Sequence, residues 1–93
     1  MTDRTERLDI VLNRLCLTRS RSEAKNACEV GAVLVGGRPA RASQSVVPGD
    51  QIALRFKNRL LEIRILEVPG KSLSKKAARE LFEVVRDERL EGR

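Results

Sequence analysis

The stretch SRSEAKNACEVGAVLVGG, residues 20–37, contains the signals that decide the fold. Ser20 and Glu23 form a Ser-x-x-Glu capping box, because the Ser20 hydroxyl can accept from the backbone N–H of Glu23 while the Glu23 carboxylate reaches back. Gly31 predicts the end of this helix, since glycine adopts the left-handed cap conformation at low cost. We therefore expect a short basic helix that leads directly into a strand.

A glycine pair after this helix predicts a β-hairpin. Residues 32–35 and 38–40 flank Gly36 and Gly37, and glycine at both central positions supplies the positive φ that type I′ turns require. Pro39 indicates an edge strand, because proline has no N–H to donate to a neighbouring strand. We therefore expect the basic helix to pack against a hairpin whose second strand is an edge.

The residues before this stretch predict another helix, which begins near Leu8. Its apolar positions follow the i, i+4, i+7 spacing of a helix with one buried stripe: Leu8, Leu12 and Leu15, with Val11 alongside. Asp9 has two possible interpretations, as a helix cap or as the partner of a neighbouring arginine. With the basic helix, this segment predicts a short αα unit.

The second half of the chain predicts two strands. Pro48-Gly49-Asp50 has the composition of a turn, with Asp50 as a turn residue. Two alternating runs follow this turn, and their inward positions are Ile52, Leu54 and Phe56 in the first and Leu61, Ile63 and Ile65 in the second. Because the alternation has the period of a strand with one buried face, we expect both runs to join one antiparallel sheet.

A helical pattern begins near Ser74. Ser72 or Ser74 can cap this helix, and its apolar stripe consists of Ala78, Leu81, Phe82 and Val85. The fold class is therefore α+β, with two N-terminal helices on a small, mostly antiparallel β-sheet and a C-terminal helix that covers the sheet.

The charge of the chain favours a polyanionic partner. Nineteen Lys and Arg residues against thirteen Asp and Glu residues leave a net charge of +6, which makes nucleic acid the leading partner class. The excess is concentrated in residues 14–41, where six basic residues meet two acidic ones: Arg14, Arg19, Arg21, Lys25, Arg38 and Arg41 against Glu23 and Glu29. A membrane is a weaker alternative, because no apolar run approaches the roughly 18 residues needed to span one.

The residue types present argue against catalysis and metal binding. The chain has no histidine and no tyrosine, and no paired carboxylates stand out, so we expect no enzyme, cofactor or small-molecule substrate. Cys16 and Cys28 form no Cys-x-x-Cys pair, so we expect no zinc site but two reduced core thiols at apolar helical positions. Since residues 1–7 contain no apolar signal segment, we expect a cytoplasmic protein.

Several of these elements together resemble the S4 RNA-binding domain. The resemblance rests on the order and spacing of Arg7-Leu8-Asp9, Leu12, residues 20–25, residues 31–37 and Gly49-Asp50. It covers about residues 7–55 as an S4-like RNA-binding motif, and residues 56–93 form a strand and C-terminal helix extension of the same single domain. Gly36 stands where the family most often has asparagine, and since both residues tolerate positive φ, we expect the turn geometry to survive.

A chain with this motif and no catalytic module resembles the stand-alone heat shock protein 15 type and its ribosome quality-control relatives. The resemblance implies a protein that binds ribosomal RNA and tRNA on free large ribosomal subunits still holding a peptidyl-tRNA, and we expect it to be a monomer. One alternative is a ribosome-assembly factor or structured-RNA chaperone. Another, of a different class, is a protein-interaction adaptor that docks through a helix bearing Leu81, Phe82 and Val85.

The candidate RNA contacts gather at the start of the basic helix. Arg19, Arg21 and Lys25 lie where unpaired backbone N–H groups and the positive end of the helix dipole favour phosphate. The complete set of candidates is Arg7, Arg14, Arg19, Ser20, Arg21, Ser22, Lys25, Arg38 and Arg41. Lys75, Lys76 and Arg86 are better explained as a solvated surface. Because the only aromatic residues, Phe56 and Phe82, are expected in the core, we expect recognition of RNA shape rather than base stacking.

Overall fold

The structure is a computed structural model that describes residues 5–56, 58–69 and 74–89. Two predictions lie outside the described part of the chain: the inward side chain of Phe56 and the cap at Ser72. The elements in chain order are β1 (Glu6–Arg7), α1 (Leu8–Arg14), α2 (Arg21–Glu29), β2 (Val33–Val35), β3 (Arg38–Pro39), β4 (Ser45–Val46), β5 (Gln51–Phe56), β6 (Arg59–Ile65), α3 (Lys75–Arg79) and β7 (Phe82–Arg89).

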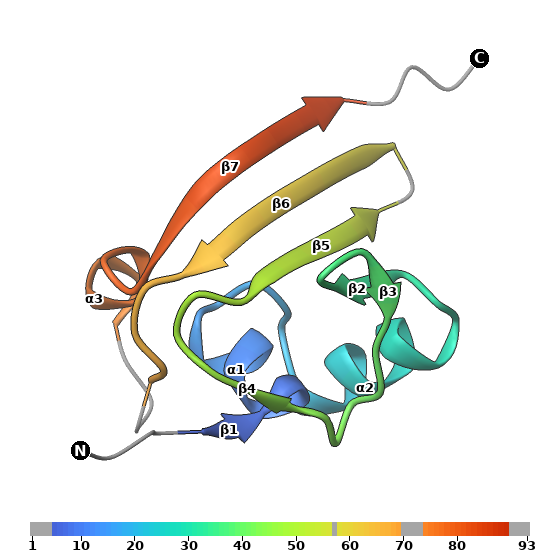
Figure 1. Cartoon of the computed structure of the whole chain (residues 1–93), viewed down its shortest axis with the longest axis horizontal. Helices are drawn as coiled ribbons and strands as arrows, with labels where there is room; N and C mark the ends of the chain where they lie inside the picture. Colours follow the sequence, from blue (N-terminus) through green and yellow to red (C-terminus); the bar gives the residue numbers. More distant parts are fainter. Residues whose placement is uncertain (1–4, 57, 70–73, 90–93) are drawn as a thin grey trace.

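The main sheet is antiparallel and has the strand order β3-β2-β5-β6-β7, while β1 and β4 form a separate two-stranded sheet. Figure 1 shows β5, β6 and β7 side by side as a long ribbon, with α1, α2 and the short strands gathered at one side of it. The molecule is elongated, 48 Å along its longest axis and 25 and 22 Å along the others. The α+β prediction is confirmed.

The capping box of α2 is confirmed. The backbone N–H of Glu23 donates to the Ser20 Oγ at 3.1 Å, and the Glu23 carboxylate accepts from the backbone N–H of Arg19. Val30 is the C-cap, and the following Gly31 has φ of +77°, as a helix-ending glycine requires. The start and end of this helix therefore follow from residues within it and next to it.

The predicted hairpin is also confirmed. Val35 pairs with Arg38 across the turn, and Gly36 and Gly37 have φ values of +62° and +85°. Strand β3, which contains Pro39, is an edge of the main sheet, so the missing N–H of proline leaves no ladder hydrogen bond unmade.

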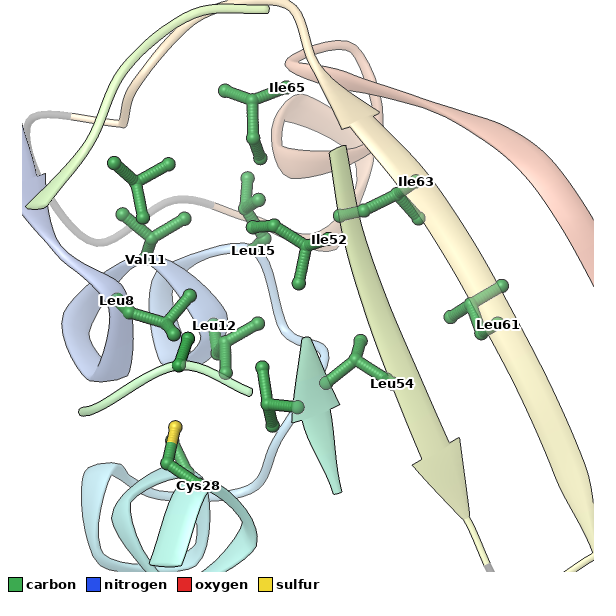
Figure 2. Packing of buried hydrophobic residues seen from close by; sticks show 14 of the residues in the cluster. Leu8, Val11, Leu12, Leu15, Cys28, Ile52, Leu54, Leu61, Ile63 and Ile65 are labelled. Atoms are coloured by element: carbon green, nitrogen blue, oxygen red, sulfur yellow. The ribbon is translucent and has the colours of Figure 1, made fainter. Parts of the chain in front are cut away.

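The core lies between α1, α2 and one face of the main sheet. Figure 2 shows the apolar side chains of α1 directed toward Ile52 and Leu54 of β5, with Cys28 of α2 below them. The predicted inward residues are buried: Leu8, Val11, Leu12, Leu15, Ile52, Leu54, Leu61, Ile63 and Ile65. The turn before β5 also forms, with Gly49 at φ of +97° and the Asp50 carboxylate accepting from the backbone N–H of Val47 at 3.0 Å.

The C-terminal helix is present but is much shorter than the apolar stripe predicted. Helix α3 ends at Arg79, and its cap is Ser74, whose Oγ accepts from the backbone N–H of Ala77 at 3.2 Å. The predicted continuation of this helix through Val85 is wrong, because the chain enters β7 at Phe82 and pairs with β6 from Phe82 to Arg89, with a register shift at Val85. The helical spacing of the apolar stripe is outweighed by pairing with the free edge of β6, because a strand there forms hydrogen bonds with backbone N–H and C=O groups that would otherwise have no partner.

The structure also removes the helical docking ridge of the adaptor hypothesis. Leu81 and Phe82 are partly buried and pack against the core, whereas Val85 lies in β7 and is 46% exposed. These three side chains therefore share no helix face.

One of the two cysteines is not where it was predicted. Cys28 is buried, and burial raises the pKa of its thiol, with smaller contributions from the charges of Asp9 and Glu29. Cys16 is exposed and has φ of +64°, because α1 already ends at Arg14 and the chain turns there toward α2. The prediction that Cys16 is a core residue is therefore wrong. Within the described ranges, no helix has the length and apolar character needed to cross a membrane.

Candidate nucleic-acid interface

A buried carboxylate organises the basic face at the start of α2. The Asp9 side chain is 4% exposed, and the Arg7 guanidinium donates to it twice, from Nε to Oδ1 and from Nη2 to Oδ2, each at 3.2 Å. The Arg21 Nη2 lies 3.6 Å from the same Oδ2. Asp9 is thus the partner of arginines, and the alternative that it caps α1 is wrong, because Arg7 is the N-cap and no side chain caps that helix end.

This arrangement leaves positive charge facing solvent. The side chains of Arg7 and Arg21 are 48% and 55% exposed, so both guanidinium groups reach the surface while one carboxylate holds them together. A guanidinium has five N–H donors, and the contacts to Asp9 leave donors on both arginines for an anion. One buried negative charge therefore positions two positive charges that lie far apart in the sequence.

A groove beside this pair collects further cations. It runs between α2 and the segment that links β3 to β4, and its lining includes Arg7, Lys25 and Arg41 together with Ser43. Glu29 is the acidic residue among the described lining residues. The groove thus joins side chains from three segments of the chain into one positively charged surface. Arg21 does not line the groove, but it pairs with Asp9, which also holds the lining residue Arg7. We call Arg7, Arg21, Lys25 and Arg41 the α2 basic face.

The other candidate residues are distributed around this face. Arg38 is exposed on edge strand β3, and Ser20 and Ser22 are exposed at the start of α2, where the Ser20 hydroxyl is already the helix cap. Arg19 lines a different hollow, together with Leu17 and Lys75. The structure therefore does not place all nine candidates on one surface.

Arg14 has a structural environment that the sequence did not indicate. Its Nη1 donates to the Glu6 carboxylate at 3.2 Å and to the backbone carbonyl of Pro69 at 3.3 Å, and its side chain is 26% exposed. It therefore connects α1 to β1 and to the segment after β6. Glu6 and Pro69 both lie outside α1, so the periodicity of this helix does not predict the contacts of Arg14.

A second group of cations lies away from the α2 basic face. Arg59, Lys75 and Arg79 line an open groove between the end of α1, α3 and the β6–β7 ribbon. From the sequence, Lys75 was expected to belong to the solvated surface, and Arg59 and Arg79 were not among the candidate residues. The missed signal was the spacing of Lys75 and Arg79, which lie four residues apart and therefore share one face of a helix.

The described residues hold no group of three or more His, Cys, Asp and Glu side chains suited to a metal ion. The chemistry that the α2 basic face offers is the binding of anions by charge and by N–H donors. Since arginine presents paired donors to phosphate, this chemistry suits a sugar-phosphate backbone.

Comparison with known proteins adds a family and several relatives. The S4 domain family model matches residues 6–52. The RQC P-site tRNA stabilizing factor of Bacillus subtilis (strain 168) is 30% identical over 84 residues, which cover 90% of this chain and 96% of that protein. The protein of the same name from Halalkalibacterium halodurans is 35% identical over 82 residues, covering 88% of this chain and 92% of the relative.

A solved structure has the same fold. The trimeric structure of heat shock protein 15 from Vibrio cholerae matches with a TM-score of 0.82 and 30% sequence identity, over 88% of this chain and 83% of that one. The similarity therefore extends well beyond the segment that the family model matches, into the β6–β7 ribbon.

Proposed function

Because this chain belongs to the S4 domain family, we propose that it binds ribosomal RNA and tRNA on the large ribosomal subunit. Its role in this proposal is ribosome rescue or quality control, in which it holds the tRNA of a stalled peptidyl-tRNA in place. The names of its relatives support this assignment, since they are called RQC P-site tRNA stabilizing factors. The protein acts by binding and carries out no covalent step.

The observation that carries the proposal is the pairing of Arg7 and Arg21 on the buried carboxylate of Asp9. Folded RNA presents phosphates at fixed positions, so a protein that recognises its shape needs cations that are also held in position. A free surface arginine loses side-chain entropy when it binds, whereas an arginine already held by a carboxylate loses less. The Asp9 ion pairs thus prepare the α2 basic face for binding.

The individual residues have different tasks in this proposal. Arg21 and Lys25 contact phosphates from α2, Arg7 and Arg41 contact them from the two sides of the groove, and Arg38 adds charge from the hairpin. Ser20 maintains the start of α2, and the hydroxyl of Ser22 is exposed beside it. Arg19 extends the contact toward the opposite side of the helix, and Arg14 acts mainly by holding α1 in place.

The proposal also covers the cellular location, the oligomeric state and the cofactor requirement of the protein. The chain works in the cytoplasm, where ribosomes are found, as a monomer that needs no metal, cofactor or small-molecule substrate. Light scattering of the purified chain tests the monomer, and a trimer, the state of heat shock protein 15 in its solved structure, would contradict it.

Binding to ribosomal particles tests the function directly. The natural chain is crosslinked to purified large subunits carrying peptidyl-tRNA, and the contacted RNA is sequenced. Arg21→Glu is expected to lose these crosslinks, and because it also takes a cation from the buried Asp9 carboxylate, crosslinking is measured well below the melting temperature of the variant. Arg86→Glu is the matched control, because it makes the same change in net charge at a side chain that is also 55% exposed. Equal crosslinking by both variants would refute the proposal, and enrichment on immature particles would favour an assembly factor instead.

A further inference from the structure

The groove at the junction of α3 and the β6–β7 ribbon has a chemical character that the α2 basic face does not explain. It has a volume of about 650 Å³, within the range of roughly 300–1,000 Å³ typical of ligand pockets. Its apolar lining residues are Leu15, Leu17, Leu61, Phe82 and Val84. Leu15 and Leu61 are buried, Phe82 is partly buried, and Val84 is 53% exposed, so the apolar surface is open to solvent at one side.

Cations surround this apolar surface. Lys75 and Arg79 line the groove from α3, and Arg59 lines it from β6. Arg59 is held by Asp87 through two hydrogen bonds of 2.8 Å. Lys75 and Arg79 are exposed and form no ion pair with any described residue. The net effect is an apolar floor with positive charge at its margin, which favours a ligand that is both flat and anionic.

The groove also continues toward α2. A second hollow shares Cys16, Leu17 and Lys75 with the first and reaches Arg19 at the residue before the α2 cap. Among the described residues that line the two hollows, one is acidic, Glu23, and its carboxylate accepts from the backbone N–H of Arg19. A cationic path therefore leads from the start of α2 to α3.

We propose that this groove binds an unpaired segment of the same RNA whose folded part contacts the α2 basic face. The inference rests on the proposed function and adds a second contact of a different kind. Lys75 and Arg79 bind phosphates of the unpaired segment, and a base lies against Leu61, Phe82 and Val84. Bases without partners can lie on apolar or aromatic side chains in this way, and such contact tolerates sequence variation because each base has a π face.

An acidic peptide is the occupant that this chemistry fits less well. Carboxylates would pair with Lys75 and Arg79, but a peptide has no flat group that is required to cover the floor. An RNA segment offers both kinds of contact, because its bases can cover the apolar floor and its phosphates can pair with Lys75 and Arg79. The hollow that reaches Arg19 connects this groove to the α2 basic face.

The test uses RNA probes that separate the two contacts. One probe is a blunt RNA hairpin, and the others carry a short oligoadenosine extension at the 3′ or the 5′ end. For the natural chain, one of the extensions is expected to tighten binding about tenfold, the effect of one stacked base. This gain is expected to disappear in Lys75→Gln/Arg79→Gln, with affinity for the blunt hairpin nearly unchanged.

The matched control is Lys76→Gln/Arg86→Gln, which removes the same charge from residues that do not line the groove. It is expected to keep the gain. The salt dependence is a second readout, because loss of two single-strand phosphate contacts makes the negative slope of log K against log salt shallower by about 1.4. A gain that is absent from the natural chain, or that survives in Lys75→Gln/Arg79→Gln, overturns the inference while leaving hairpin binding intact. If the hairpin itself does not bind, both proposals fail.

Cys16 offers an independent readout that needs no substitution. It lines both hollows and is exposed, whereas the Cys28 thiol is buried and has a raised pKa, so alkylation reports on Cys16 first. The extended hairpin is expected to slow alkylation of Cys16 more than the blunt hairpin does. Protection by a glutamate-rich peptide but not by the extension would assign the groove to a protein and overturn the inference.

Discussion

The α2 basic face and the β6–β7 ribbon both contain several arginines but arrange them differently. At α2, Arg7 and Arg21 share one buried carboxylate, Asp9, so positive charge remains in excess at the surface. On the ribbon, each arginine pairs with a separate carboxylate on the neighbouring strand: Arg59 with Asp87 and Arg64 with Glu83, both exposed, and Arg86 with the half-buried Glu62. The difference teaches that the pairing of cations, more than their number, decides where a protein offers a surface to a polyanion.

The two regions also differ in what their ion pairs accomplish. Exposed cross-strand pairs align β7 on β6, and each contributes modestly because water screens both charges. The Asp9 pairs connect Arg7 of β1 and Arg21 in the first turn of α2 to α1, and the carboxylate they share is buried. The first arrangement aligns two strands, and the second holds two exposed guanidinium groups in place beside α2.

The two regions are expected to differ most in stability when the carboxylate of an ion pair, Asp9 or Asp87, is removed. Asp9→Ala leaves two guanidinium groups without their partner and is expected to lower the free energy of unfolding by about 1–3 kcal/mol, and to weaken binding to a structured RNA. Denaturant unfolding and an RNA titration measure the two effects. Asp87→Ala is the matched control on the ribbon, where the pair is exposed, and a loss of stability there as large as that of Asp9→Ala would remove the distinction between the regions.

A smaller effect, on RNA binding alone, is expected when cations of the α2 basic face that do not pair with the buried Asp9 are removed. Lys25→Gln/Arg41→Gln takes two cations from the groove beside α2. For duplex-like RNA it is expected to make the negative slope of log K against log salt shallower by about 1.8. Fluorescence anisotropy over a salt series measures this slope. Arg64→Gln/Arg86→Gln makes the same change in net charge on the ribbon, so equal slopes for both variants would mean that net charge alone governs binding.

The helix caps provide a third comparison. Ser20→Ala removes the cap of α2 and is expected to cost about 1 kcal/mol of stability, with weaker RNA binding because the first turn of α2 carries Arg21. Ser74→Ala removes the cap of the short α3 and is expected to leave the affinity for a blunt hairpin unchanged. Thermal unfolding and hairpin titrations of both variants provide the comparison. A loss of hairpin affinity in Ser74→Ala would contradict the assignment of folded-RNA binding to α2.

The smallest effect concerns pH on the ribbon. Hydrogen bonding to Arg59 holds the pKa of Asp87 below its ordinary value of 3.8. Since the folded-state pKa is lower than the unfolded one, the ion pair is fully present above about pH 4 and is lost as the pH falls through the folded-state pKa. An NMR titration of the Asp87 carboxyl carbon is expected to show a midpoint below 3.8 that returns toward this value in Arg59→Gln. An unchanged midpoint in that variant would show that Arg59 does not cause the shift.

Sequence reasoning succeeded where the decisive contacts are local. The capping box of Ser20 and Glu23, the helix end at Gly31 and the Gly36-Gly37 hairpin involve neighbours within a few residues, and all three are confirmed. The inward faces of β5 and β6 followed from alternation because one face of the sheet is buried. The resemblance to the S4 domain also depended on these local signals and their order.

Sequence reasoning failed where a distant part of the chain supplied the better partner. The stripe from Ala78 to Val85 has helical spacing, yet residues 82–89 form a strand that pairs with the edge of β6. Cys16 has the spacing of a core residue of α1, but that helix ends two residues earlier and leaves the thiol exposed. In both cases the pattern was correct for an isolated helix and tertiary contacts overrode it.

The sequence by itself determined the α2 helix, its hairpin, the buried faces of the strands and the excess of positive charge around α2, because each depends on residue type and short spacing. Only the tertiary structure decided that Asp9 joins Arg7 to Arg21, that Lys25 and Arg41 share a groove, and that Lys75 and Arg79 face an apolar floor. These groups come from separate elements, and their approach depends on how the elements pack around one core. A linear pattern records which charges are present, and packing decides which of them meet.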